Sequence, residues 1–305
     1  MNRRDVIGVA GSIAGAVGAA GATQAVATAP RPSPAKRAPI QVIAKDGVKL
    51  FHLDWGSGDP VLFSSNWGMT SEMWQYQMAP FSRQGLRCVA YDRRGTGFSA
   101  RPSGGYDIDT LADDLAAVID QLDLQKATLV GHSMAGGEIV RYLTRYGTGR
   151  VARIVLVAPT TPFLLKTADN PDGVSMADND AMRAAWCTDY PKWVAENVAP
   201  YFADGVSREM MAWVASMAMQ CSIRTAIELS HTWSETDFRG EMRKLDVPTL
   251  VIQGDKDTLP MELTGRKTAA LIPGAVFKIY KGEAHGLMFT STKRFNADLL
   301  AFMGR

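Results

Sequence analysis

One short segment places a serine among small residues where the chain can turn sharply. Residues 131–137 read GHSMAGG and follow an apolar run over 127–130. A strand, a tight turn and a helix in this order form a nucleophile elbow, which lifts a serine hydroxyl out of the sheet at the positive end of the helix. We therefore predict that Ser133 is a nucleophile. The fifth position of this pattern is usually glycine, and here it is Ala135, the smallest residue that carries a Cβ.

A serine hydroxyl is a weak nucleophile until a base takes its proton, so a histidine must lie within hydrogen-bond reach. The chain has four histidines: His52, His132, His231 and His285. His285 follows the last apolar run, in a loop at the carboxyl end of a strand, where α/β sheets place their ligands. His52 lies in an early strand and His231 in a helical insertion, and the side chain of His132 is expected to point away from the serine. We predict that His285 is the base.

An acid must hold that imidazole in the right tautomer and stabilise its charged form. Residues 254–260 follow another apolar run and contain two candidates, Asp255 and Asp257. Pro260 and the helix expected after it favour Asp257 as the inward-facing residue, while Asp255 is expected to serve the turn. Asp257 is therefore the predicted acid.

Acyl transfer also requires backbone N–H groups aimed at the oxygen on which negative charge develops. The residue after the nucleophile supplies one of these groups, the amide of Met134. The loop over residues 65–69, which reads SNWGM after the apolar run 61–64, is the expected source of the second.

Apolar runs alternate with amphipathic stretches along most of the chain, which predicts parallel strands, crossover helices and an α/β fold with both faces of the sheet covered. The predicted strands are 40–44, 48–54, 61–64, 87–91, 127–130, 153–157, 249–253 and 276–280. The predicted helices are 73–84, 109–122, 138–146, one after Pro260, and 293–302.

The alternation stops near Pro159, and from about 160 to 239 the chain is rich in Met and Trp with a helical pattern. A helical insertion in an α/β sheet is most simply a cap over the active site. We expect most of its large side chains to pack within the cap and a minority to line an apolar ligand pocket. The residues expected in that pocket are Trp67, Phe163, Trp186 and Met288.

Composition excludes several classes of protein. The 305 residues suit one large α/β domain with an insertion, and a net charge of +2 without a basic stripe indicates no nucleic-acid partner. Cys88, Cys187 and Cys221 show no metal-ligand spacing, so no metal site is expected from them. We expect buried free thiols, with a pair between Cys187 and Cys221 as the alternative. The pair Arg93–Arg94 is expected to brace a glycine turn and not to bind substrate.

The N-terminus resembles an export signal of the twin-arginine type. Arg3 and Arg4 precede a weakly apolar Gly/Ala stretch, and residues 25–27 offer a small-x-small cleavage site. The expected order is a signal peptide over 1–27, a Pro-rich linker over 28–39 and the catalytic domain over 40–305. The mature protein would be periplasmic or secreted, without stable membrane association. The alternative is a retained N-terminal membrane anchor.

Several motifs besides the elbow resemble one family, the α/β-hydrolases described as cofactor-free (non-haem) haloperoxidases and aryl esterases. The chain order Ser, Asp, His is also that of α/β-hydrolases. The matching segments are YDRRGTGFS over 91–99, GHSMAGGEIVRY over 131–142, SETDF over 234–238, VPT over 247–249, EAHG over 283–286 and NADLLAF over 296–302.

The resemblance implies an α/β-hydrolase fold with a helical cap, a triad of Ser133, Asp257 and His285, and an oxyanion hole made by the amides of Trp67 and Met134. It implies no metal or organic cofactor. Family members usually carry His-Gly before the tryptophan and often proline after it, whereas this chain has Ser65, Asn66 and Gly68 at these positions. Asn tolerates left-handed backbone, and Gly68 cannot rigidify the loop as proline would.

The leading prediction is a serine hydrolase that cleaves aryl or short-chain carboxylic esters through an acyl-enzyme. The alternatives are a perhydrolase or cofactor-free haloperoxidase, a lactonase, and a ligand-binding receptor on the same fold. The expected partner is a small-molecule ester, and the oligomeric state is left open, a homo-oligomer included. An aspartate nucleophile, which dehalogenases use, is disfavoured because the elbow carries serine.

Overall fold

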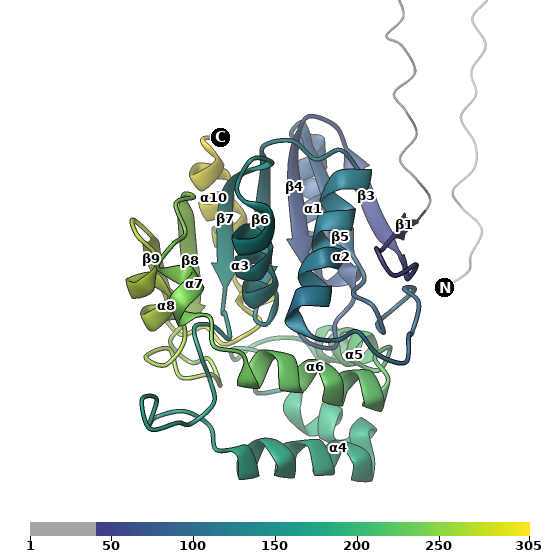
Figure 1. Cartoon of the computed structure of the whole chain (residues 1–305), viewed down its shortest axis with the longest axis vertical. Coiled ribbons are helices and arrows are strands. Elements are labelled where there is room, and N and C mark those ends of the chain that lie inside the picture. The colour runs from purple at the N-terminus through teal and green to yellow at the C-terminus, as the bar shows by residue number, and fades with distance from the viewer. Residues whose placement is uncertain (1–40) are drawn as a thin grey trace, which may run out of the picture. The chain divides into compact units, whose positions relative to one another are not determined.

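A seven-stranded sheet forms the centre of the computed structural model, which describes residues 41–305 (Figure 1). The strands lie in the order β3-β5-β4-β6-β7-β8-β9, and only β3 runs antiparallel to its neighbour. Their bounds are β3 His52–Gly56, β4 Asp59–Ser64, β5 Leu86–Tyr91, β6 Ala127–His132, β7 Val151–Val157, β8 Thr249–Gly254 and β9 Val276–Tyr280. The signal peptide and linker predicted over 1–39 lie outside the described residues.

Helices cover both faces of this sheet, as Figure 1 shows. Helices α2 and α3 lie on one face, and α1 and α10 on the other; their bounds are α1 Gln75–Arg83, α2 Ile108–Gln121, α3 Ala135–Tyr146 and α10 Thr292–Met303. On β4, Leu62 packs into the core beneath α2 and α3, and its neighbours Val61 and Phe63 pack into the opposite core. Because successive side chains on a strand alternate between two buried faces, the central strands β4, β6 and β8 are largely apolar. The predicted mostly parallel sheet with helices on both faces is confirmed.

Several short strands and helices complete the described part of the chain. They are β1 Val42–Ile43, β2 Lys49–Leu50, the 3-10 helix η1 Ser71–Trp74, α7 Arg239–Met242, α8 Gly265–Leu271 and α9 Leu287–Thr290. Strands β1 and β2 pair antiparallel across a turn in which Gly47 has a φ of 85°. The helix predicted over 73–84 is divided into η1 and α1.

Three helices lie together beyond one end of the sheet, between β7 and β8 in the sequence (Figure 1). They are α4 Met176–Asn197, α5 Arg208–Ala218 and α6 Ile223–Glu235. A serine precedes each of them, and its side chain accepts the backbone N–H of the residue three positions later; these serines are Ser175, Ser207 and Ser222.

Helix α4 bends at Asp189, whose φ of −157° and ψ of 83° are not helical. The bend lies just before Pro191, which lacks an N–H for the helical ladder and restricts the residues before it. The Asp189 carboxylate accepts the N–H of Lys192 at 2.9 Å and so begins the second half of the helix.

All three cysteines are free. Cys88 and Cys221 are buried as expected, but Cys187 is exposed on α4, so the expectation of three buried thiols is wrong for that residue. No helix within residues 41–305 combines the length and apolar character needed to cross a membrane.

Candidate active site

Ser133 occupies a strained turn at the carboxyl end of β6. Its φ is 58°, a left-handed conformation that side chains other than Asn and Asp seldom adopt. The turn is held by the Ser133 N–H, which donates to the carbonyl of Val157 on β7 at 2.8 Å. Strain of this kind persists where the surrounding structure enforces it, and it is concentrated at functional sites.

The glycines around the serine are required by close packing. A Cβ on Gly131 would lie 2.6 Å from Cδ1 of Ile139, and a Cβ on Gly137 would lie 2.5 Å from Cζ of Phe238. Helix α3 therefore approaches β6 and Phe238 closely enough to exclude larger side chains. Ala135 at the fifth position of the motif is fully buried, so the site accommodates its methyl group.

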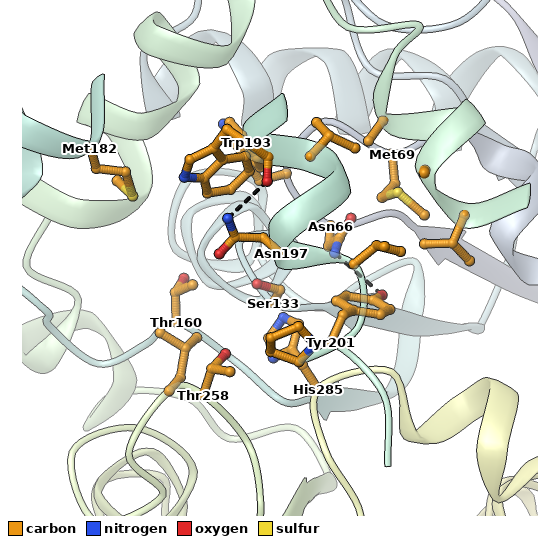
Figure 2. A pocket seen from close by; sticks show the side chains of 18 of the residues that line it. Asn66, Met69, Ser133, Thr160, Met182, Trp193, Asn197, Tyr201, Thr258 and His285 are labelled. Carbon is orange, nitrogen blue, oxygen red and sulfur yellow. Dashed lines mark hydrogen bonds between the residues drawn. The ribbon is translucent and has the colours of Figure 1, made fainter. Parts of the chain in front are cut away.

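His285 is oriented by Asp257. Its Nδ1 lies 3.0 Å from both carboxylate oxygens of Asp257, whose side chain is only 1% exposed. This contact fixes the ring so that Nε2 is the nitrogen left for a hydroxyl group. Ser133 and His285 line the same cavity and lie beside one another in Figure 2. Within residues 41–305 the Ser133 hydroxyl makes no hydrogen bond, and catalytic contacts of this kind often tighten only when substrate binds.

The two candidate acids have different surroundings. Asp255 is exposed and accepts the N–H of Gly282 at 2.6 Å within the turn. The N–H of Lys256 donates to the carbonyl of Glu283 at 2.9 Å, which joins the turn after β8 to the loop that carries His285. The structure therefore places Asp257, and not Asp255, against the imidazole.

The two predicted oxyanion donors belong to Met134, which directly follows Ser133, and Trp67, which lines the same cavity. Met134 begins the turn into α3, and Trp67 follows β4 in a loop whose indole Nε1–H donates to the carbonyl of Ala226 at 2.8 Å. Neither the Trp67 nor the Met134 backbone N–H has a protein acceptor among the described residues. In this loop Gly68, and not Asn66, adopts the left-handed conformation, with a φ of 73°. Asn66 therefore does not use the left-handed conformation that asparagine tolerates, and a proline, fixed near −65°, does not fit at residue 68.

A largely apolar cavity of about 280 Å³ opens above Ser133 and extends between the cap helices. Figure 2 shows Asn66 and Tyr201 near Ser133 and His285, with Met182 and Trp193 farther away. The residues of α4, α5 and α6 that line it are Met182, Trp186, Trp193, Val194, Asn197, Val214, Ala215, Ala218 and Trp233.

The sheet order, the elbow and the acid–base pair together agree with a known family. A family model described as alpha/beta hydrolase fold matches residues 59–212, about half of the chain. The chain belongs to the α/β-hydrolase family.

Relatives of this hydrolase include several peroxidases that lack haem. A non-heme chloroperoxidase of Kitasatospora aureofaciens is 38% identical over 269 residues, which cover 86% of this chain and 98% of that protein. A bifunctional esterase/perhydrolase of Acinetobacter calcoaceticus is 35% identical over 271 residues, with the same coverage of both chains. The resemblance to non-haem haloperoxidases is therefore confirmed.

Solved structures give the same fold. A bromoperoxidase from Bacillus anthracis superposes with a TM-score of 0.83 at 34% identity and covers 87% of this hydrolase and 100% of that chain. An esterase from Exiguobacterium antarcticum superposes with a TM-score of 0.84 at 28% identity and covers 87% of this chain and 99% of that chain.

Two of the residues expected in the pocket of the hydrolase lie elsewhere. Trp67 and Trp186 line the cavity and stack with ring centroids 4.6 Å apart. Phe163 does not line it, because its ring lies under the guanidinium of Arg239 at 4.9 Å. Met288 does not line it either, because its side chain is fully buried in the core beneath α1 and α10.

Sequence reasoning missed two supporting residues. Gln253 donates from Nε2 to Asp257 at 3.0 Å, while its Oε1 accepts the N–H of Gly265 at 2.8 Å. His132, which we expected only to point away from the serine, packs its ring 4.6 Å from that of His285. Burial and the neighbouring His285 lower the pKa of His132 well below its usual value. The available signal was its position next to Ser133 at the end of a buried strand.

Proposed function

We propose that this hydrolase cleaves carboxylic esters through an acyl-enzyme formed on Ser133. The observation that supports this most is the contact of His285 with Asp257, because His285 lines the cavity that also holds Ser133. A base oriented by a buried acid, beside a serine on a strained turn, is the arrangement used for nucleophilic acyl transfer.

In the proposed reaction the Ser133 oxygen attacks the ester carbonyl while His285 Nε2 takes the hydroxyl proton. The carbonyl oxygen becomes an oxyanion that the N–H groups of Trp67 and Met134 stabilise. When the tetrahedral intermediate collapses, the bond to the alcohol oxygen breaks and His285 returns the proton to it. Water then attacks the acyl-enzyme with the same base and releases the carboxylic acid and free Ser133.

The cavity supports esters with an apolar or aromatic group. Its walls carry four tryptophans and several aliphatic side chains, and polar groups are concentrated near Ser133. Apolar ligand sites with a few placed polar groups are typical of small-molecule binding. Lactones meet the same requirements because their scissile carbonyl is chemically an ester.

Turnover of short-chain aryl esters by the purified protein tests this function. Ser133→Ala should abolish turnover and labelling by a fluorophosphonate probe, while Ser216→Ala, at an exposed serine on α5, should change neither. Full activity of the Ser133→Ala protein would refute the proposal. Tight ligand binding without turnover by the wild type would favour a receptor instead.

Perhydrolysis is the second candidate, and the names of the chloroperoxidase and esterase/perhydrolase relatives favour it. Hydrogen peroxide would replace water in attack on the acyl-enzyme and release a peracid, which oxidises halide in solution. Bromination in the presence of peroxide and acetate, lost in Ser133→Ala, would support this activity. Absence of bromination at every acetate concentration would remove it.

We also propose that the protein is exported and cleaved near residue 27. The arginine pair and the Gly/Ala stretch that follows support this. N-terminal sequencing of secreted protein should find the mature end close to residue 28, whereas an intact Met1 in the membrane fraction would indicate an anchor.

A further inference from the structure

Arg93 is a buried residue that does not line the cavity above Ser133. Only 2% of its side chain is exposed. Its guanidinium donates from Nη2 to the carbonyl of Ser65 at 2.7 Å and from Nη1 to the carbonyl of Asn66 at 3.0 Å. Its Nε donates to Glu138 Oε1 at 2.5 Å. One buried side chain thus holds two consecutive carbonyls of the loop after β4.

The second of these carbonyls belongs to a peptide unit with a role in the proposed reaction. The C=O of Asn66 and the N–H of Trp67 are the two ends of one planar trans peptide, so they point in opposite directions. A guanidinium that fixes the C=O on one side therefore aims the N–H to the other side. That N–H is one of the two groups proposed to receive the oxyanion.

The partner of Arg93 connects this loop to the other oxyanion donor. Glu138 lies in the first turn of α3, the helix that begins directly after Ser133 and Met134, and its side chain is fully buried. Its second oxygen accepts the hydroxyl of Tyr91 at 3.3 Å. The Arg93–Glu138 ion pair therefore joins the peptide unit 66–67 to the helix whose start carries the Met134 N–H.

We propose that Arg93, supported by Glu138, is a positioning residue that sets the geometry of the oxyanion hole. The proposal rests on the serine-hydrolase function proposed above. A cation on the Asn66 carbonyl also polarises the peptide and strengthens its N–H as a donor, because linked hydrogen bonds reinforce one another. Both effects act on charge that exists only in the transition state, so they raise kcat and leave KM nearly unchanged.

The adjacent residue provides a matched control. Arg94 is 1% exposed and donates to Asp114 on α2 through two bonds of 2.6 Å, and to Asp46. Unlike Arg93, it makes no hydrogen bond to the oxyanion loop. Removing either arginine breaks a buried ion pair and should lower stability by similar amounts. Only Arg93 should affect the oxyanion.

The experiment compares Arg93→Lys with Arg94→Lys, because lysine keeps the charge but cannot reach three acceptors with a planar fork. We would measure kcat and KM on an aryl ester, the affinity for a trifluoromethyl ketone, which forms an oxyanion on Ser133, and the melting temperature. Arg93→Lys should lower kcat and ketone affinity roughly 10–100-fold, in line with a misplaced donor, with KM changed less than about threefold. Arg94→Lys should lower only the melting temperature.

Glu138→Gln and Asp114→Asn form a second pair, which decides the matter if Arg93→Lys does not fold. Glu138→Gln should lower kcat and ketone affinity in the same direction, and Asp114→Asn should not. Equal kcat losses in the two members of a pair, or a change confined to KM, would overturn the positioning role. Failure of the proposed function looks different, because the wild type would then show no ester turnover that depends on Ser133.

Discussion

His132 donates its Nε2–H to the main-chain carbonyl of His285 across 3.0 Å. The acceptor is a carbonyl, so Nε2 must carry the hydrogen. The ring is fully buried, and its Nδ1 has no hydrogen-bond partner among the described residues. A neutral imidazole is the form that such surroundings favour, because burial penalises the charge. His132, which directly precedes Ser133, thus supports the loop that carries His285.

This burial predicts a pH dependence of stability. The pKa of His132 lies well below 6.5 in the folded state and near 6.5 in the unfolded chain. The unfolded state therefore binds the extra proton below about pH 6.5, so the stability contribution is present above that pH and is lost as pH falls. The variant His132→Gln keeps an N–H donor but no titrating ring. Between about pH 7.5 and about pH 5.5 its melting temperature should fall by less than that of the wild type.

His231→Gln is the control, because His231 is exposed on α6. Its melting temperature should follow the wild-type curve. The pKa of His52 is also lowered by burial, so His132→Gln should reduce the acid sensitivity without removing it. Identical pH dependence in the His132→Gln and wild-type proteins would contradict the assignment.

The two aspartates after β8 give a sharp test of the triad. Asp257→Asn should lower kcat by roughly 10⁴-fold, because an amide at this position favours the wrong tautomer of the imidazole. Asp255→Asn should leave kcat within about twofold, since Asp255 caps only the turn at Gly282. The measurement is kcat on an aryl ester with both variants checked by circular dichroism. Comparable losses in both would argue against Asp257 as the orienting acid.

Local patterns were sufficient to predict the sheet and the pairing of His285 with Asp257 at its edge. The central strands are largely apolar because both of their faces are buried. Ser133 directly follows β6, and Asp257 and His285 lie in the loops after β8 and β9. Residues that follow the carboxyl ends of parallel strands meet at one edge of the sheet, even when they are distant in the chain. Their proximity can therefore be predicted once the strands have been identified in the sequence.

The pocket and its supports could not be predicted in the same way. Whether Phe163 or Trp186 lines the cavity depends on how the cap helices pack, and Arg239 from outside the cap helices covers Phe163. The sequence marks Arg93 and Arg94 only as charges beside a glycine turn. Their different partners, the oxyanion loop and α2, come from tertiary structure.

Packing at the elbow predicts opposite responses at neighbouring glycines. Gly136→Ala and Gly137→Ala both lie in α3 and gain similar helix propensity. A Cβ at Gly136 would meet Pro159 Cβ at 3.4 Å, an ordinary contact, whereas at Gly137 it would lie 2.5 Å from the buried ring of Phe238. The free energy of unfolding should therefore be about 1–3 kcal/mol lower for Gly137→Ala than for Gly136→Ala, because this is the usual loss of stability when a core is overpacked. Urea denaturation measures both, and equal values would show that Phe238 moves freely.

The side chains of α5 that line the cavity are expected to limit the size of the substrate's acyl group. Ala215 on α5 lines the cavity, while Ala212 on the same helix is exposed and does not. Ala215→Phe fills part of the cavity, so kcat/KM should fall roughly 10–100-fold for aryl esters of long acyl chains and change little for acetates. Ala212→Phe, the matched control, should leave both unchanged. If kcat/KM of Ala215→Phe fell equally for long and short acyl groups, the new ring would be disturbing Ser133 or His285. The acyl chain would then bind away from α5.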